Sequence, residues 1–349
     1  MTSEDRSKTI KTISVLGEAM VQWGQDLPKS EFNNFIAEPF YDQMNSVILS
    51  EKHHNGWFTE SSIRESLSNL GQLLTQDQLV DWISNYQFSG SDKKVGLIMA
   101  GNIPLVGFHD FLSVLLSGNK PHIKLSSDDK RLMPILIDIL FELQPELSDR
   151  IRLVNKVSDV DAVIATGSNN SARYFEKYFG HLPNIIRKNR TSVAVLTGEE
   201  SELELKELGR DIFTYFGMGC RNVSHILVPE NYDLNNFFGA IVDFGEIINH
   251  NKYANNYDYY KAIYLLNMEE ILENGFMLLR SSDELFAPIA VLHHQKYKDT
   301  KEVESFLDEN KEGIQAVVGR GHIPFGQAQS PKLDDYADGV DTMDFLSSL

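Results

Sequence analysis

Apolar residues recur at helical spacing through the first 86 residues of the chain. Positions three and four apart form one apolar face of a helix, and such a face packs against a neighbouring element. Thr75 comes before the last of these segments and Gln78 follows three residues later, as in a capping box at a helix start. We therefore expect an N-terminal helical segment, residues 1–93, that packs on the following domain. The segments with this period are 14–25, 32–50, 60–74 and 75–84, and the second is expected to be kinked or split at Pro39.

The pattern changes at Lys94, where short apolar runs begin to alternate with helical segments. Unbroken apolar strands separated by helices are typical of βαβ crossovers, and therefore of a parallel sheet covered on both faces. Ligands of such sheets bind beyond the carboxyl ends of the strands, and here Gly101, Gly167 and Gly198 each end a run. We expect an α/β domain with a parallel sheet over residues 94–197, although the standard G-x-G-x-x-G dinucleotide fingerprint is missing. The runs are 95–101, 122–126, 151–154, 161–167 and 192–198, with helical segments at 108–119, 129–144 and 170–180.

The second half of the chain also mixes helical and strand patterns. An acidic helical segment, 199–217, leads to a turn that holds Cys220, and an apolar strand follows at 224–229. We expect a smaller α/β catalytic domain over residues 198–323. Its further strands are expected at 262–267, 286–294 and 314–319. Residues 324–349 are polar and rich in turn residues, which indicates a segment that returns across another domain or subunit.

Charge and cysteine content exclude several partner classes. The chain has 50 acidic and 32 basic residues, a formal net charge of -18, and this balance argues against nucleic acid, whose phosphates need a basic face. No stretch approaches the roughly 18 uninterrupted apolar residues of a membrane span. A single cysteine fits a reducing compartment, so we expect a cytoplasmic protein. The histidine pairs at 53–54 and 293–294 are adjacent in sequence, unlike helical ligand pairs, and we expect no metal.

Three segments at strand ends carry candidate binding groups. In "AGNIPL" the turn could aim the Asn102 amide at a developing oxyanion, or Asn102 could simply cap the turn. In "TGSNNSARYF" Gly167 and Ser168 open a helix whose N-terminus suits a cofactor phosphate, although an ordinary N-cap gives the same pattern. In "IKLSSDD" Lys124 could reach a ribose or phosphate, or be solvated.

The only cysteine lies in "FGMGCRN", in a setting that favours chemistry. Gly217 and Gly219 leave space around Cys220, and the charge of Arg221 favours the thiolate, which is the reactive form. The alternative is a buried, inert cysteine that serves as a small apolar residue. Local sequence leaves these two interpretations open.

Taken in order, these segments resemble the aldehyde dehydrogenase superfamily from about residue 94 to about residue 330. "GNIPLVGFHDFLSVLLSGNKPHIKLSS" is similar to that family's asparagine-proline turn, helix and "KPSE" strand. "TGS" is similar to its cofactor turn, "GMGC" to its cysteine loop and "DELFAP" to its "EEIFGP". Within the superfamily the chain most resembles the acyl-CoA reductase family, typified by the fatty-acid reductase of bacterial luminescence. The ending "IPFGQAQSPKLDDYADGVDTMDFL" is the most specific match.

The resemblance implies a fold and a set of site residues. The fold would be aldehyde-dehydrogenase-like α/β, with a parallel Rossmann-type, dinucleotide-binding domain at residues 94–197 and a smaller α/β catalytic domain at residues 198–323 that carries the cysteine. Cys220 would be the acyl-accepting nucleophile, and its backbone N–H together with Asn102 would form the oxyanion hole. The cofactor-binding residues implied are Lys124, Ser127, Gly167 and Ser168 at the dinucleotide, and Glu284 and Phe286 near the nicotinamide riboside.

Two departures from the family pattern bear on the chemistry. Hydrolytic members have "ELGG" where this chain has "VLTG", so Val195 would replace the glutamate that activates water, which favours hydride or thiol as the acyl acceptor. The "KPSE" glutamate, which contacts the adenosine ribose in NAD-preferring members, becomes Ser127. Serine does not repel a 2′-phosphate, so we expect NADPH as the cofactor, with NADH as the alternative.

These inferences predict an NAD(P)H-dependent reduction of an acyl thioester, such as acyl-CoA, to an aldehyde through a cysteinyl acyl-enzyme. A CoA-acylating aldehyde dehydrogenase working in the oxidative direction would use the same residues. A non-catalytic, dehydrogenase-like binding protein is the alternative from another class. His109 and His225 lie nearest to the motifs in sequence, and we assign the proton donor to neither. Superfamily precedent makes a homo-oligomer possible, and acyl chain length does not follow from the sequence.

Overall fold

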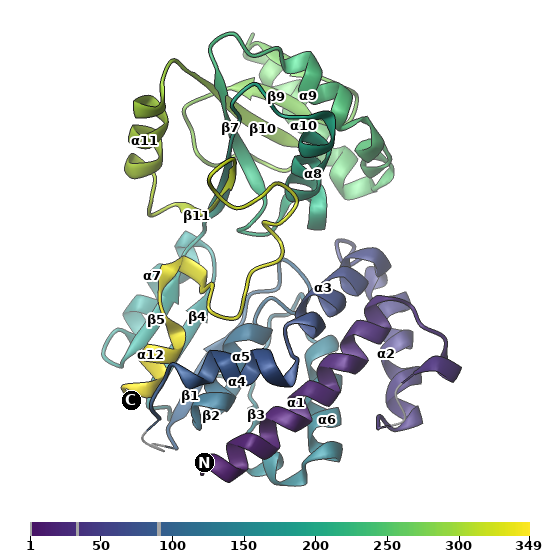
Figure 1. Ribbon diagram of the computed structural model, residues 1–349, viewed down its shortest axis with the longest axis vertical. Helices are drawn as coiled ribbons and strands as arrows, with labels where there is room; N and C mark the ends of the chain where they lie inside the picture. The colour runs from purple at the N-terminus through teal and green to yellow at the C-terminus, as the bar shows by residue number, and fades with distance from the viewer. Residues whose placement is uncertain (1, 33–34, 89–91) are drawn as a thin grey trace. The chain divides into compact units, whose positions relative to one another are not determined.

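The computed structural model describes residues 2–32, 35–88 and 92–349. The chain divides into two compact units, one formed by Met1–Lys188 together with Lys332–Leu349 and the other by Asn189–Pro331 (Figure 1). Each unit contains one β-sheet.

The first unit is built on a fully parallel sheet with strand order β3-β2-β1-β4-β5. β1 lies in the middle, and the chain proceeds outward from it first through β2 and β3 and then through β4 and β5. This order places a switch point between β1 and β4, where doubly wound sheets bind their ligands beyond the strand ends. The strands are β1 (Lys94–Ile98), β2 (Lys120–Lys124), β3 (Arg152–Leu153), β4 (Ala162–Thr166) and β5 (Asn184–Arg187).

Helices cover this sheet and share one hydrophobic core with it. Buried residues of the N-terminal helices, among them Leu16, Met20 and Leu67, belong to the same cluster as Val95 and Leu97 of β1. The N-terminal helices are α1 (Ser3–Gly24), α2 (Glu38–Ser50), α3 (Glu60–Gln72) and α4 (Gln76–Ser84). The helices between the strands are α5 (Phe108–Ser117), α6 (Leu132–Leu143) and α7 (Asn169–Phe179). Short 3-10 helices of the unit lie at Lys29–Glu31, Glu51–His53, Pro145–Asp149 and Ala337–Gly339.

The second unit contains a six-stranded sheet with order β11-β6-β7-β10-β9-β8, in which only the β8–β9 pair is antiparallel. β6 belongs to this sheet because it pairs with β7 on one side and β11 on the other. The apolar pattern placed the run 192–198 in the first sheet, and this expectation is wrong, because the run forms a strand of the second sheet. The strands are β6 (Thr191–Val195), β7 (Val223–Pro229), β8 (Ile271–Glu273), β9 (Leu278–Ser281), β10 (Val291–Tyr297) and β11 (Ile314–Gly319).

One strand expected in the second unit is wrong. Residues 262–267 end a helix, α10, which buries Tyr253, Tyr257 and Tyr264. Successive tyrosines in this set are four and seven residues apart, which is the spacing of one helical face. This helical pattern extends over more residues than the short apolar run 262–267, and the segment is therefore a helix. The other helices of the unit are α8 (Glu202–Phe213), α9 (Leu234–Ala240), α10 (Asn251–Leu266) and α11 (Thr300–Glu309), with 3-10 helices at Thr214–Gly217 and Val242–Asn249.

The C-terminal residues return to the first unit and end in α12 (Thr342–Ser347), which packs on α5 (Figure 1). Tyr336 holds this segment to α4, since its hydroxyl accepts a hydrogen bond from Trp82 Nε1 at 2.7 Å. Arg187, at the end of β5, forms a buried ion pair with Asp110 of α5 and donates to the Thr342 hydroxyl at 2.9 Å. One guanidinium thus joins a strand, a helix and the returning segment.

In the described part of the chain, no helix is both long and apolar enough to cross a membrane. Nor do the described residues bring three His, Cys, Asp or Glu side chains together in a group that could hold a metal ion.

Candidate functional site

Asn102 lies in the turn that follows β1, and buried polar groups fix this turn. The Asp129 carboxylate accepts the Leu105 N–H at 2.7 Å, and the Ser66 hydroxyl donates to the Pro104 carbonyl at 2.7 Å. Leu105 has a φ of 58°, a left-handed conformation that costs energy for a branched side chain and persists only where its surroundings enforce it. The Asn102 side chain itself is exposed. The turn therefore holds an exposed amide on a rigid backbone.

Asp129, which accepts the Leu105 N–H, is a buried acidic residue that the sequence analysis did not single out. It is 6% exposed, and burial raises the pKa of its carboxyl to about 7, against the weaker opposing effect of the Leu105 N–H. In "SSDD" it looks like one of two surface carboxylates, and only the fold distinguishes buried Asp129 from exposed Asp128.

Lys124 ends β2 beside this turn. It pairs with Ile98 of β1, and its carbonyl accepts the Met99 N–H at 3.1 Å. The following loop, which contains exposed Ser127, packs against Gly101, where a Cβ would lie 2.7 Å from that of Ser126. Glycine is therefore required at position 101, because the two turns approach each other this closely.

Gly167 and Ser168 follow β4, the neighbour of β1 on the other side. The Ser168 hydroxyl accepts the Ser171 N–H at 3.2 Å, so Ser168 is the N-cap of α7. A Cβ at Gly167 would lie 2.9 Å from the Ser171 Cβ and 3.1 Å from Cε2 of Phe175, which leaves no room for a side chain. Glycine is therefore required at position 167, because α7 begins this close to the strand end.

The first unit thus brings five of the predicted residues to one edge of its sheet. Because β2, β1 and β4 are parallel neighbours, their carboxyl ends lie side by side at the switch point. The residues at this edge are Asn102, Lys124, Ser127, Gly167 and Ser168.

Cys220 lies in the second unit, in the turn between the 3-10 helix Thr214–Gly217 and the amino end of β7. Cys220 is of intermediate exposure. Tyr215 and Phe216, just before it, have φ angles of 53° and 59°, and Gly217 continues this left-handed path at 78°. Two consecutive aromatic residues in this conformation are unusual, and such backbone strain clusters at functional sites.

Val195 does not lie beside Cys220 as the "ELGG" comparison suggested. The cysteine turn contacts the other end of β6, where the Ser192 hydroxyl donates to the Cys220 carbonyl at 3.1 Å. Val195 comes three residues later, and a strand advances about 3.3 Å per residue, or about 10 Å over three residues. The absence of a glutamate at position 195 therefore gives no information about water activation at this thiol.

Glu284 and Phe286 lie in the loop after β9. The Phe286 side chain is 45% exposed, and the Glu284 side chain pairs weakly with Arg280 at 3.3 Å. Two imidazoles fix the backbone of this loop, since Nδ1 of His225 and Nδ1 of His293 lie 3.0 Å and 2.8 Å from the Glu284 carbonyl. Both rings are at most 1% exposed, and burial lowers the pKa of each. The two rings are therefore neutral and donate from Nδ1.

Acid should weaken the contribution of His225 to stability. Burial lowers the pKa of His225 to about 4, whereas histidine in an unfolded chain has a pKa of about 6.5. Between these values the unfolded chain binds a proton that the folded chain does not, so the contribution is intact above about pH 6.5 and is lost as the pH falls toward 4. Relative to the unaltered protein, His225→Asn should be less stable at neutral pH, and this deficit should shrink by about 2 to 3 kcal/mol by about pH 4.

Urea unfolding followed by circular dichroism at a series of pH values would measure the effect. Asparagine can still donate to the Glu284 carbonyl, so the substitution removes the titrating ring and keeps the hydrogen bond. A deficit that does not change with pH would contradict the prediction.

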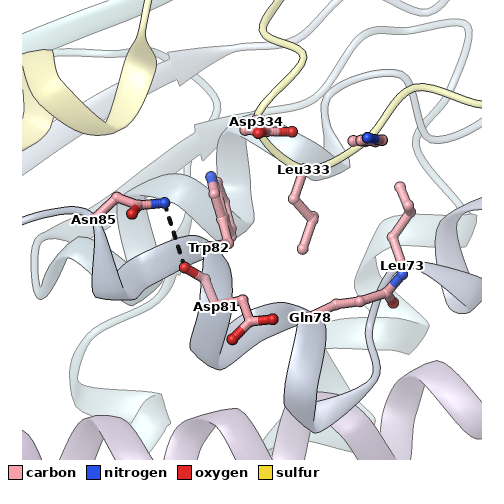
Figure 2. Close-up of a pocket in the computed structure, with 8 residues that line it drawn as sticks. Leu73, Gln78, Asp81, Trp82, Asn85, Leu333 and Asp334 are labelled. Atoms are coloured by element: carbon pink, nitrogen blue, oxygen red, sulfur yellow. Dashed lines mark hydrogen bonds between the residues drawn. The ribbon is translucent and has the colours of Figure 1, made fainter.

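The structure contains a cavity in each unit, and only the one in the second unit lies beside a turn with a predicted site residue. One of about 280 Å³ opens between α4 and the returning segment of the first unit, with Trp82, Asp81 and Asn85 on one side and Leu333 and Asp334 on the other (Figure 2). No predicted site residue lines it. The other, of about 20 Å³, lies in the second unit beside the cysteine turn, with Phe216 and Ser224 in its wall. It holds about one water molecule.

Comparison with solved structures defines the class of protein. Aldehyde dehydrogenase 21 from Physcomitrella patens, complexed with succinate, superposes with a TM-score of 0.63 at 12% identity, over 100% of this chain and 89% of that one. A Mycobacterium tuberculosis aldehyde dehydrogenase complexed with NAD+ superposes with a TM-score of 0.61 at 13% identity, over 89% of this chain and 72% of that one. The NAD+ complex of an aldehyde dehydrogenase from Bacillus cereus superposes with a TM-score of 0.58 at 14% identity, over 91% of this chain and 72% of that one. The chain therefore has the aldehyde dehydrogenase fold, as its motifs predicted.

A comparison of the sequence with models of protein families identifies the family. Residues 8–241, more than half of the chain, match the acyl-CoA reductase (LuxC) family. The protein belongs to this family, and it is an oxidoreductase of aldehyde chemistry. No curated protein sequence matches the chain significantly.

Proposed function

We propose that this protein reduces an acyl-CoA to an aldehyde with NADPH, through an acyl group carried on Cys220. The observation that carries the proposal is the family match, because its span from 8 to 241 includes the Asn102, Gly167 and Cys220 turns. The strained backbone before Cys220 supports a chemical role for that turn.

Acylation is the first step. The Cys220 thiolate attacks the carbonyl carbon of the thioester while the Asn102 amide donates to the oxyanion. The bond from carbon to the sulfur of CoA breaks, CoA leaves as a thiolate that takes up a proton, and the acyl group remains on Cys220 as a thioester.

Reduction is the second step. A bound reduced nicotinamide supplies the hydride. The carbonyl carbon of the cysteinyl thioester accepts it, and Asn102 again donates to the oxygen. Collapse of the resulting thiohemiacetal releases the aldehyde and returns Cys220 to the thiolate form. In sum, acyl-CoA, NADPH and a proton give an aldehyde, CoA and NADP+.

The carboxyl edge of the first sheet fits a pyridine nucleotide. The α7 N-terminus carries partial positive charge and suits the diphosphate. Lys124 would contact a ribose or phosphate. Glu284 and Phe286, both exposed, are the residues proposed for the nicotinamide riboside.

A 2′-phosphate is favoured by Ser127, which supplies a hydroxyl where a carboxylate would repel it. Asp128 is also exposed in the same loop, so we expect a preference and not an exclusion of NADH. Comparing kcat/KM for the two cofactors tests this part of the proposal separately.

The acyl-enzyme is the decisive intermediate, and it is expected to accumulate without nicotinamide. Incubation with acetyl-, octanoyl- or tetradecanoyl-CoA should leave an adduct in the intact mass that peptide mapping assigns to Cys220 and that Cys220→Ser lacks. Addition of NADPH should remove the adduct and yield aldehyde. If a folded protein forms no adduct with any of these thioesters, the proposal is wrong.

A further inference from the structure

Asn222, two residues after Cys220, has a buried side chain with several hydrogen bonds. It is 2% exposed. Its Oδ1 accepts the Gly219 N–H at 2.7 Å, and its Nδ2 donates to the carbonyls of Asp211 at 3.0 Å and Thr214 at 2.8 Å. Nδ2 also lies 3.3 Å from the Ile212 carbonyl. A single amide therefore joins the end of α8 to the residue immediately before Cys220.

The same turn is attached to β6 from its other side. The Asn222 carbonyl accepts the Ser192 N–H at 3.1 Å, and the Ser192 hydroxyl donates to the Cys220 carbonyl at 3.1 Å. Strained residues such as Phe216 keep their conformation only where surrounding contacts over-determine it. The Asn222 bonds provide that constraint across residues 211–219, because they fix the backbone on both sides of the strained stretch.

Asp211 connects this network to a second segment. Its side chain is fully buried, and the two carboxylate oxygens accept the N–H groups of Gly326 at 2.7 Å and Ala328 at 3.0 Å. Arg221, next to the cysteine, donates to the Ala328 carbonyl at 3.4 Å. We call residues 323–330 the strap, and Figure 1 shows it, in yellow-green, beside α8. The strap is thus bonded to residues before and after Cys220.

The strap is a fixed part of the second unit. Ala328 is 0% exposed and belongs to its hydrophobic core, against which Ile323 and Phe325 also pack. Gly326 has a φ of 79°, which suits glycine alone at this crowded position. The strap coincides with the "IPFGQAQS" motif, for which the two chemical steps give no role.

We propose that Asn222 and Asp211 are positioning residues that hold the Cys220 thiol in its reactive orientation, Asn222 through the Gly219 N–H and Asp211 through the strap. The inference rests on the proposed function, since it takes Cys220 as the nucleophile. A displacement of a reacting group by about 1 Å can lower a rate a hundredfold, so loss of these bonds should reduce acylation even in a folded protein.

Asn222→Asp and Asp211→Asn test the proposal with almost no change of shape. Aspartate at 222 can still accept the Gly219 N–H but has no donor for the three carbonyls. Asparagine at 211 keeps one oxygen acceptor for the strap and loses the other. Asn184→Asp is the matched control, because Asn184 also donates to two backbone carbonyls, that of Phe179 at the end of α7 and that of Leu182 in the following turn, in the other unit.

The rate of Cys220 acylation by acyl-CoA, measured well below the unfolding midpoint of each variant, should fall at least about tenfold in Asn222→Asp and Asp211→Asn. It should stay within about twofold in Asn184→Asp. Alkylation by iodoacetamide, at a pH where the thiol is fully ionised, needs no such orientation and should change far less than acylation in every variant. A purely structural role would slow acylation and alkylation alike, so it would not produce this difference between the two reactions.

The outcomes separate the two proposals. If the unaltered protein forms no adduct, the proposed function fails and this inference fails with it. If the unaltered protein acylates and both variants acylate at its rate, only the positioning role is overturned. Should Asn222→Asp fail to fold, Asp211→Asn alone decides the question, because it leaves every Asn222 bond in place.

Discussion

Asp110→Ala is expected to lower the free energy of unfolding by about 3 to 5 kcal/mol, because it removes the carboxylate that neutralises a buried guanidinium. Asp110 and Arg187 are 9% and 5% exposed. A charge in such surroundings has lost most of its hydration, so removing the Asp110 carboxylate from this buried pair costs much more than breaking a surface pair. Arg187 also donates to Thr342, so its displacement should loosen α12 as well.

Tryptophan fluorescence during urea unfolding measures this effect selectively. All three tryptophans, at positions 23, 57 and 82, lie in the first unit, as does the ion pair. Glu146→Ala is the control, since it breaks the exposed Lys8–Glu146 pair and should cost at most about 1 kcal/mol. Arg187→Met added to Asp110→Ala should recover part of the loss. Equal costs for Asp110→Ala and Glu146→Ala would contradict the prediction.

β5, which carries Arg187, shows where the sequence was insufficient. Its four residues, "NIIR", contain only two apolar positions, too few to distinguish a strand from a loop. Longer apolar runs did predict β1 and β4. The run 192–198 predicted a strand but not its sheet, because strand pairing depends on contacts distant in sequence.

The site shows the same division between local and distant information. Turn chemistry at strand ends is local, and it picked out Asn102 and Gly167, which lie on neighbouring strands of one sheet edge. The groups that hold such turns are not local. Asp129 is 24 residues from the Leu105 N–H that it binds, and Asp211 is 115 residues from Gly326. Only the folded chain brings these partners together.

Buried polar groups fix three of the turns that carry predicted site residues. Asp129 holds the Asn102 turn, Asn222 the Cys220 turn, and His225 with His293 the Glu284 loop. Buried hydrogen-bonding groups are costly when unpaired, so they specify one backbone arrangement strongly when paired. The exposed side chains of Asn102 and Glu284 are thereby presented from backbones with little freedom to relax, which is what preorganised binding groups require.

Asn102→Ala is expected to lower kcat for acyl-CoA reduction by about 10² to 10³, the usual effect of removing one oxyanion donor. The oxyanion develops in both acylation and hydride transfer, so both steps should slow. KM for acyl-CoA should change little, because the amide bonds to a charge that exists only at the transition states. Steady-state rates and single-turnover acylation would measure the two effects separately.

Two further variants show whether the amide acts as a donor. Asn102→Asp keeps the shape and replaces the donor by a carboxylate that repels the oxyanion, so it should be at least as slow as Asn102→Ala. Asn256→Ala, which removes an amide bonded to its own helix at the Lys252 carbonyl, should react at the unaltered rate. If Asn102→Ala raised KM and left kcat unchanged, Asn102 would bind the ground state of the substrate, and the oxyanion donor would have to be sought in the backbone of the Cys220 turn.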